Sequence, residues 1–451
     1  MVKIPQALLD NLQGVKGFDA AAFIAAHGLP APTSVRINPA KNIGLFTANE
    51  KVPWCSGGVY LNERPVFTLD PAYHAGSYYV QEASSMFLAH MLNSVLDGKE
   101  GLRVLDLCAA PGGKSTLIAS LLDKDSLLVS NEVIRTRASI LEENMTRWGY
   151  MNTWVTSNDP RDFGKLSGYF DVIVVDAPCS GSGLWRKDPR ALDEWSEANV
   201  QMCSERQRRI LADVWPALKE DGVLVYATCS YSPQEDEQVL DWLAHEYEVK
   251  SLPVSIKDEC GITEVQTEKR MTAYRFFPGK VKGEGFFIAA IRKTEEADTL
   301  RPAKFKTAND KKIQQHAGYL LTDPNQLFIP TGNDGYSAIR PEHEADLHIL
   351  QKAVYLRKTG LKLGSASAKE WLPDHEVALS TDANGSLPCI EMNREQALHF
   401  LKREDPGVGE TPKGWHIVRY HGLGLGWVKS LGNRLNNYLP KQWRIRMEID
   451  S

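Results

Sequence analysis

From about residue 100 the chain alternates between short apolar runs and longer amphipathic segments. The apolar runs end in polar residues and lie at 103–109, 126–132, 171–177 and 222–229, with a further strand-like run at 283–293. Segments with helical spacing of apolar residues separate them, at 115–122, 137–149 and 202–218. Buried strands that alternate with helices are typical of a mostly parallel, doubly wound sheet. The pattern therefore predicts an α/β domain at 99–293.

The residues before this domain mix helical and extended patterns. Apolar residues recur at helical spacing over 5–28, and a β-like stretch follows at 33–39. The amphipathic pattern at 78–96 predicts a helix. We expect an N-terminal α+β extension at 1–98 that serves RNA binding or another accessory role.

Three further parts are predicted after the α/β domain. Residues 294–312 carry many charges and few apolar side chains, which indicates a linker. An intermediate domain at 313–380 is expected to contain strands at 326–330 and 347–356. A final module at 381–451 contains a helical pattern at 393–404.

Composition narrows the class of protein. A chain of 451 residues exceeds what one hydrophobic core usually supports. No apolar stretch approaches the ~20 residues of a membrane helix, and the N-terminus lacks the apolar core of a secretory signal. Seven cysteines without a CxxC pair favour neither a disulfide framework nor a structural metal site. We therefore expect a cytoplasmic protein without a membrane or metal partner.

A glycine-containing loop follows the first predicted strand. It consists of Cys108, Ala109, Ala110, Pro111, Gly112, Gly113 and Lys114. A phosphate-binding P-loop would need glycine where Cys108 stands, so the cradle for phosphates is incomplete. The small residues still allow a ligand to approach the backbone closely.

Acidic residues follow the next predicted strands at the same edge. Glu132 can accept the ribose hydroxyls of an adenosine, Asp159 an adenine amino group, and Asp176 ends the next strand. Each acid alone is equally compatible with capping a helix. Together with the incomplete phosphate cradle, the set favours S-adenosylmethionine over a nucleoside triphosphate.

Two cysteines lie just past strand ends on this edge, Cys179 in "DAPCSGSG" and Cys229 in "YATCSYSPQEDE". A thiolate that adds to C6 of a pyrimidine makes C5 nucleophilic enough to accept a methyl group. That cycle needs a nucleophilic cysteine, an acid near N3 and assistance with elimination, which Cys229, Cys179 and Asp176 can supply. The remaining cysteines are expected to be small buried hydrophobes: Cys55, Cys203, Cys260 and Cys389.

These motifs, with "DLCAAPGGKST" upstream, closely resemble the bacterial RNA cytosine-C5 methyltransferase family of the Fmu/Sun type. The order of parts is similar to that of RsmF-type enzymes, which act on 16S ribosomal RNA. The resemblance implies a Rossmann-like methyltransferase sheet, with Cys229 as nucleophile and Cys179 assisting breakdown of the adduct. It also places the cofactor on residues 108–114, Glu132, Asp159 and Asp176. DNA cytosine methylases use their P-C cysteine as the nucleophile, so the opposite assignment competes.

The last forty residues reverse the charge of the chain. Residues 412–451 contain seven Lys and Arg against two acids, a net charge of +5, whereas the whole chain has −5. The interleaved aromatic residues are Trp415, Tyr420, Trp427, Tyr438 and Trp443. Cations beside stacking surfaces suit RNA, although a solvated basic face over an aromatic core has the same pattern. Here the sequence resembles a PUA-like RNA-binding module, which favours RNA.

Two smaller features also concern RNA. Arg186 and Lys187, in the loop after Cys179, are compatible with phosphate contacts or with simple exposure. Gly422, Gly424 and Gly426 precede no helix, so they indicate a turn or a close approach of RNA.

The sequence therefore predicts an S-adenosylmethionine-dependent RNA cytosine-C5 methyltransferase. Its expected partner is 16S rRNA or the small ribosomal subunit, and a monomer is expected. The alternatives are a tRNA or 23S rRNA methyltransferase and a non-catalytic RNA-binding assembly factor, although the last would not need the cysteine pair.

Overall fold

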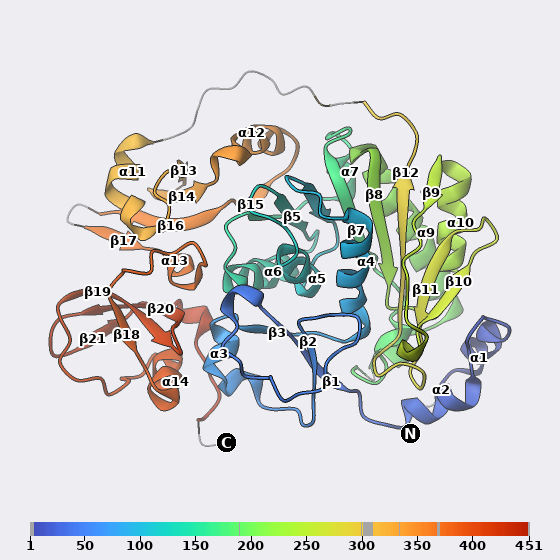
Figure 1. The fold of residues 1–451 in the computed structure, drawn as a ribbon, viewed down its shortest axis with the longest axis horizontal. Coiled ribbons are helices and arrows are strands. Elements are labelled where there is room, and N and C mark those ends of the chain that lie inside the picture. Colours follow the sequence, from blue (N-terminus) through green and yellow to red (C-terminus); the bar gives the residue numbers. More distant parts are fainter. Residues whose placement is uncertain are drawn as a thin grey trace.

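The computed structural model describes the chain except residues 1–3, 189, 299, 301–309, 333, 368–369 and 450–451. Within these residues a ten-stranded sheet forms the centre, in the order β10-β11-β12-β8-β7-β4-β5-β6-β15, with β9 beside β12 (Figure 1). The parallel strands are β4 (Arg103–Asp106), β5 (Leu127–Asn131), β6 (Thr153–Thr156), β7 (Phe170–Asp176) and β8 (Leu218–Thr228). The antiparallel additions are β9 (Val249–Ser251), β10 (Thr263–Gln266), β11 (Thr272–Phe276), β12 (Phe286–Lys293) and β15 (Leu356–Lys358). The predicted α/β sheet is thus confirmed.

Each face of this sheet has its own hydrophobic core because successive strand residues point to opposite sides. Val104 and Leu128 face a core built with α4 (Phe87–Leu96), α5 (Gly113–Ala119) and α6 (Arg135–Trp148). Leu105 and Val129 face the second core, with α7 (Pro160–Phe163), α9 (Glu197–Val214) and α10 (Glu237–Glu246). Strands buried on both faces explain the nearly continuous apolar runs of the sequence.

The N-terminal extension combines α1 (Gln6–Leu12), α2 (Ala20–His27) and α3 (Pro71–His74) with a small sheet in the order β2-β1-β3. These strands are β1 (Thr33–Ile37), β2 (Gly58–Leu61) and β3 (Tyr78–Val80). The helix predicted at 78–96 is therefore wrong in its first part. Tyr78, Tyr79 and Val80 are aromatic and β-branched and pair with β1, so the α-helix begins only at Phe87.

Two further sheets follow in the C-terminal third. One contains β13 (Leu327–Thr331), β14 (Gly335–Ile339), β16 (Leu361–Ala366) and β17 (Trp371–Pro373). The other contains β18 (Cys389–Glu391), β19 (Gly414–Tyr420), β20 (Leu423–Ser430) and β21 (Leu435–Asn437). The helices of this part are α11 (Lys311–Ala317), α12 (Glu344–Ala353), α13 (His375–Leu379) and α14 (Arg394–Lys402), while α8 (Arg190–Glu194) belongs to the central domain.

The strand predicted at 347–356 is wrong, because most of it forms helix α12. Leu347 and Leu350 lie one helical turn apart and are both buried in the second core. The chain then enters β15, which pairs with β6 and extends the central sheet. Most of the predicted linker, residues 299 and 301–309, lies outside the described residues.

The two C-terminal sheets contact each other and the rest of the chain through buried groups. The indole Nε1 of Trp427 donates to the carbonyl oxygen of Asp374 at 2.9 Å. The buried Lys41 Nζ donates to carbonyl oxygens of Ala75, Arg147 and Leu379 at 2.9, 2.6 and 2.6 Å. Lys41 therefore connects the N-terminal, central and C-terminal parts of the chain.

Across the described ranges, no helix has both the length and the apolar character that crossing a bilayer requires.

Candidate functional site

The carboxyl ends of the parallel strands border a cleft of about 680 Å³. Parallel strands deliver the residues that follow them to one edge of a sheet, where ligands of open α/β folds bind. The predicted site residues that line it are Cys108, Ala110, Pro111, Lys114, Glu132, Asp159, Asp176, Cys179 and Cys229. Ala109, Gly112 and Gly113 do not line it, so their contribution is to shape the loop. The structure thus brings together both cysteines and all three predicted acids.

The loop after β4 is fixed from behind by helix α6. Asn144 Nδ2 donates to the carbonyl of Pro111 at 2.8 Å, and Arg137 Nη2 donates to that of Ala110 at 2.8 Å. Gly112 has a φ of +114°, a left-handed conformation that favours glycine. Burial raises the pKa of the Cys108 thiol, which keeps it neutral. The loop therefore presents a rigid backbone, and Cys108 offers no thiolate.

Lys114 extends from this loop toward the strand that carries Asp176. Its Nζ lies 2.7 Å from Asp176 Oδ2 and 5.0 Å from the centroid of the Phe286 ring. Burial disfavours the ammonium charge most, but the attraction and hydrogen bond of Asp176, with smaller contributions from Cys229 and Asp106, together raise the pKa of Lys114. The site therefore holds a half-buried ion pair between Lys114 and Asp176.

Glu132 and Asp159, the two acids predicted to bind the cofactor, differ in how firmly they are held. The Glu132 side chain is buried, and its Oε1 accepts the amide of Ile134 at 2.9 Å. Asp159 is 43 % exposed, and its Oδ1 accepts the amide of Arg161 at 3.2 Å as the N-cap of α7. Both acids thus accept backbone hydrogen bonds, and Asp159 does act as a helix cap.

Exposed apolar side chains lie between these acids. Val133 and Ile134 are 54 % and 48 % exposed, yet both line the cleft, as do Pro160 and Ile210. A flat apolar surface beside acceptors suits a purine base and its ribose. These residues therefore fit the adenosine part of S-adenosylmethionine.

The two cysteines that follow β7 and β8 meet in the cleft. Cys179 Sγ lies 2.9 Å from Cys229 Sγ, and both are free thiols. The hydrogen bond to Cys229, burial and the nearby Glu235 carboxylate all raise the pKa of Cys179. Cys179 therefore stays protonated and can donate to the sulfur of Cys229.

Sequence reasoning missed several charged residues at this site. Asp106, the last residue of β4, is buried, accepts Ser115 Oγ at 2.6 Å and has its pKa raised to about 7 by burial. Asp106 could have been identified from the sequence, because it ends a strand as Asp176 does. Arg206 and Arg209 are exposed on α9 and line the cleft. Only the tertiary fold places their helix beside the cysteines.

Some expectations about RNA contacts are corrected. Arg186 is buried and forms an ion pair with Glu284 at 2.9 Å, so it is not available to a phosphate. A Cβ on Gly424 would lie 1.8 Å from the carbonyl oxygen of Ala378, so this close approach is internal and does not involve RNA. Trp427 is buried and belongs to the core, whereas Tyr438 is 44 % exposed. Cys389, expected to be buried, is exposed.

Comparisons with known proteins agree with this geometry. Residues 93–292 match the family model of 16S rRNA methyltransferase RsmB/F. Residues 4–83 match the N-terminal domain of 16S rRNA methyltransferase RsmF, and residues 387–445 match the methyltransferase RsmF PUA domain.

Relatives cover nearly the whole chain. The chain is 33 % identical to ribosomal RNA small subunit methyltransferase F of Shewanella piezotolerans, over 93 % of this chain and 92 % of the relative. It is 31 % identical to the protein of the same name from Vibrio atlanticus, over 98 % of each chain.

Solved structures show the same fold. A methyltransferase homolog from Pyrococcus horikoshii is 29 % identical with a TM-score of 0.53, over 64 % of this chain and 100 % of that one. NSun6 of the same organism, solved with SFG, is 21 % identical with a TM-score of 0.55, over 65 % and 100 %. From the full-length relatives and the three matched parts, we conclude that the chain belongs to the RsmB/F family of 16S rRNA methyltransferases, in its RsmF type.

Proposed function

We propose that this chain transfers a methyl group from S-adenosylmethionine to C5 of a cytosine in 16S rRNA, with Cys229 as the nucleophile. The observation that carries the assignment is the pair of free thiols, 2.9 Å apart, at the ends of adjacent parallel strands. They share one cleft with the acids and apolar side chains that suit adenosine. A base that enters this cleft can meet both thiols.

The adenosine half of the cleft would hold the cofactor. Glu132 is placed to accept ribose hydroxyls, and Asp159 to accept the adenine amino group through the oxygen that does not cap α7. Val133 and Ile134 provide the apolar surface for the base. When bound, S-adenosylmethionine supplies an electrophilic methyl group.

The cysteine half would activate the cytosine. Cys229 Sγ adds to C6, which places negative charge on the ring and makes C5 nucleophilic. The Lys114–Asp176 pair can place a proton donor near N3, where this charge is stabilised. Asp176 would be the acid near N3, and Lys114, whose Nζ lies 2.7 Å from its Oδ2, would hold it in place.

After C5 is methylated, the adduct must break down. The C5 proton is released to solvent water in the open cleft, the electrons of the C5–H bond restore the C5–C6 double bond, and those of the C6–Sγ bond return to Cys229. Cys179, a protonated thiol that contacts Cys229 Sγ, can stabilise the departing thiolate by a hydrogen bond. This supports Cys229 as the nucleophile and Cys179 as the assisting group.

RNA would approach over α9 and the C-terminal module. Arg206 and Arg209 are exposed at the cleft and suit phosphates. The target cytosine must leave its stack to reach the thiols.

In this proposal residues 1–98 and 381–451 contact RNA, residues 99–293 catalyse the reaction, and residues 313–380 connect these parts. We propose that the chain acts as a monomer in the cytoplasm, where its rRNA substrate lies.

The assignment of the two thiols is tested with 16S rRNA that contains 5-fluorocytosine. Fluorine cannot leave C5 as a proton does, so wild type should form a protein–RNA adduct that survives denaturing electrophoresis. Cys229→Ala should form no adduct and show no turnover. Cys179→Ala should transfer a methyl group and then stall, so that it forms an adduct even with unmodified RNA.

Cys203→Ala is the matched control, because Cys203 is buried in α9 and does not line the cleft. It should trap RNA at the wild-type rate. If Cys179→Ala abolishes the adduct and Cys229→Ala does not, the roles are exchanged. If neither thiol matters, the C5 mechanism is wrong.

A further inference from the structure

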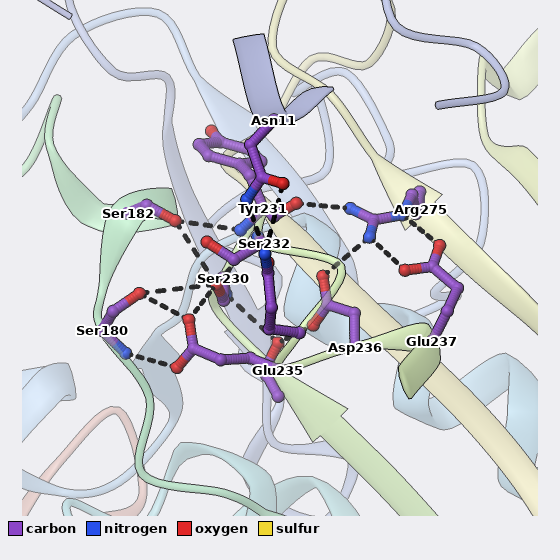
Figure 2. A network of polar contacts seen from close by, with 12 residues as sticks. Asn11, Ser180, Ser182, Ser230, Tyr231, Ser232, Glu235, Asp236, Glu237 and Arg275 are labelled. Atoms are coloured by element: carbon purple, nitrogen blue, oxygen red, sulfur yellow. Dashed lines mark hydrogen bonds and ion pairs between the residues drawn. The ribbon is translucent and has the colours of Figure 1, made fainter. Parts of the chain in front are cut away.

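The carboxylate of Glu235 lies behind the two loops that carry Cys179 and Cys229, and it has no role in the chemistry described above. Glu235 has no exposed surface. Ser180 donates to it twice, through its amide to Oε1 at 2.7 Å and through its hydroxyl to Oε2 at 2.6 Å. Ser230 Oγ donates to Oε2 at 2.5 Å, and Gln207 Nε2 donates to Oε1 at 3.3 Å. Figure 2 shows the side chains of Ser180 and Ser230 directed at this carboxylate.

The two serines are the immediate chain neighbours of the two thiols. Ser180 follows Cys179, and Ser230 follows Cys229. One carboxylate therefore binds both loops at the residue next to each cysteine. Two contacts between the loops add to this: the amide of Gly183 donates to the carbonyl of Cys229 at 2.7 Å, and the amide of Tyr231 donates to Ser182 Oγ at 2.9 Å.

Glu235 has different hydrogen-bond partners from those of the next two carboxylates in the sequence, Asp236 and Glu237. Asp236 and Glu237 both pair with the guanidinium of Arg275, at 3.1 and 2.5 Å (Figure 2). Among the described residues no cation forms an ion pair with Glu235, which is held by neutral donors. A buried carboxylate of this kind is costly unless its oxygens are hydrogen-bonded, so separating either loop from it would be unfavourable.

We propose that Glu235 is a positioning residue that holds the Cys179 and Cys229 loops together, so that both thiols reach one cytosine. Its side chain does not touch the substrate, because it lies behind the loops and does not line the cleft. This proposal rests on the proposed function, since the thiols are its reason. A displacement of about 1 Å at reacting atoms can cost roughly a hundredfold in rate, so the effect should be large.

The first test uses Glu235→Ala and Glu235→Gln in the full chain. For Glu235→Ala, we expect the rate of adduct formation with 5-fluorocytosine 16S rRNA to fall roughly tenfold or more. Affinity for S-adenosylmethionine, measured by calorimetry, and for RNA should stay unchanged, so kcat falls and KM does not. Glu235→Gln should restore most of the rate, because an amide can accept from the Ser180 amide and donate to the hydroxyls. Glu246→Gln, at an exposed position of α10, is the matched control.

A second readout does not depend on RNA. With the oxidant diamide, the thiols of wild type should form a Cys179–Cys229 disulfide quickly, as measured by peptide mapping. Glu235→Ala should form it more slowly, because the two loops lose the carboxylate that binds both of them. If wild type does not methylate or trap RNA, the proposed function fails, and the disulfide rates still report on the positioning.

A third variant keeps the proposal testable if Glu235→Ala does not fold properly. If Glu235→Ala loses cofactor binding or unfolds, the double variant Ser180→Ala/Ser230→Ala keeps the carboxylate and removes both hydroxyl donors. Ser230 then no longer binds Glu235, while the Ser180 amide still does. It should show the same selective loss of trapping and of disulfide rate. Wild-type trapping and wild-type disulfide formation in either folded variant would overturn the proposal.

Discussion

At the scale of single residues, the charged groups that line the cleft differ in their partners. Glu132 is buried beside Arg137, whereas Lys114 pairs with Asp176. The raised pKa of Cys179 makes it the proton donor of the thiol pair. This assignment follows from the hydrogen bond between the sulfurs, which the sequence motifs alone do not contain.

The adenosine assignment predicts an effect on cofactor affinity. Glu132→Ala should weaken S-adenosylmethionine binding by ~1–3 kcal/mol, the range of a lost hydrogen bond to a charged group. Asp159→Ala should have a smaller effect, because Asp159 is 43 % exposed and water competes for it. Titration calorimetry measures both.

Asp162→Ala serves as the control for these two variants. Asp162 lies in α7, pairs with Lys165 and does not line the cleft. Its substitution should leave cofactor affinity unchanged. Wild-type affinity in Glu132→Ala would show that the strand-end acid does not hold the ribose.

At the scale of elements, short helices are held in place by buried groups at their ends. Helix α13 begins at His375, which lies against the Trp443 ring with a centroid distance of 4.6 Å. Burial lowers the pKa of His375 to about 3. The helix therefore joins the last module to the preceding sheet through a neutral histidine.

This histidine predicts that acid destabilises the protein. An unfolded histidine has a pKa of 6.5, so between pH 6.5 and about 3 the unfolded chain binds the additional proton. The contribution of His375 to stability is complete above pH 6.5 and is lost as the pH falls. From pH 7 to pH 5 the free energy of unfolding should decrease by up to about 2 kcal/mol through this group.

The measurement is urea unfolding, followed by tryptophan fluorescence, at pH 7 and pH 5. His375→Phe keeps a ring against Trp443 and should lose this part of the pH dependence. His245→Phe, at an exposed position of α10, should keep the full dependence. An equal pH dependence in His375→Phe and wild type would contradict the prediction.

At the scale of the whole molecule, the C-terminal module is part of the fold and is not a detachable tail. Trp427 and Ile417 share a core with residues of the preceding sheet, and Lys41 connects three parts of the chain. Removing 381–451 would expose this core. Its RNA contacts should therefore be tested by surface substitutions.

Charge reversal on the module should weaken RNA binding and its dependence on salt. Lys413, Arg434, Lys441 and Arg444 are exposed. Replacing all four by Glu should lower the slope of log K against log[salt] by about 0.7 to 0.9 for each phosphate that the protein no longer neutralises. Cofactor affinity should not change. Filter binding to 16S rRNA over a range of salt concentrations measures the slope.

The double variant Lys99→Glu/Lys124→Glu is the control. Both lysines are exposed near the amino ends of the parallel strands, away from the cleft. They should leave the slope nearly unchanged. An unchanged slope in the fourfold variant would mean that the basic face is only solvated.

Much of the central domain could be predicted from the sequence. Strands β4, β5, β7 and β8 are buried on both faces, so they appear as apolar runs, and parallel connection places their carboxyl ends at one edge. This is why the glycine-containing loop, Glu132, Asp176 and both cysteines could be assigned to one site from their positions along the chain. The motifs around Cys179 and Cys229 also indicated the family.

Local pattern was insufficient where long-range pairing decides the structure. Residues 78–80 form a strand only because β1 lies beside them, and residues 347–353 form a helix because two leucines reach the second core. From its sequence context Arg186 would be an exposed cation in a loop. In the structure it is buried in an ion pair with Glu284, which comes from a distant segment of the chain.

The sequence by itself thus determined the class of sheet, the edge that carries the chemistry, and the residue types present there. Tertiary structure decided which of those groups touch. It placed the two sulfurs 2.9 Å apart, paired Lys114 with Asp176, and put Glu235 behind both loops. The physical reason is that Cys179 and Cys229 are 50 positions apart in the sequence. They meet only because the strands that precede them, β7 and β8, pair side by side. The distance between the two sulfurs and the burial of Cys179, which keep the Cys179 thiol protonated, both arise from that pairing.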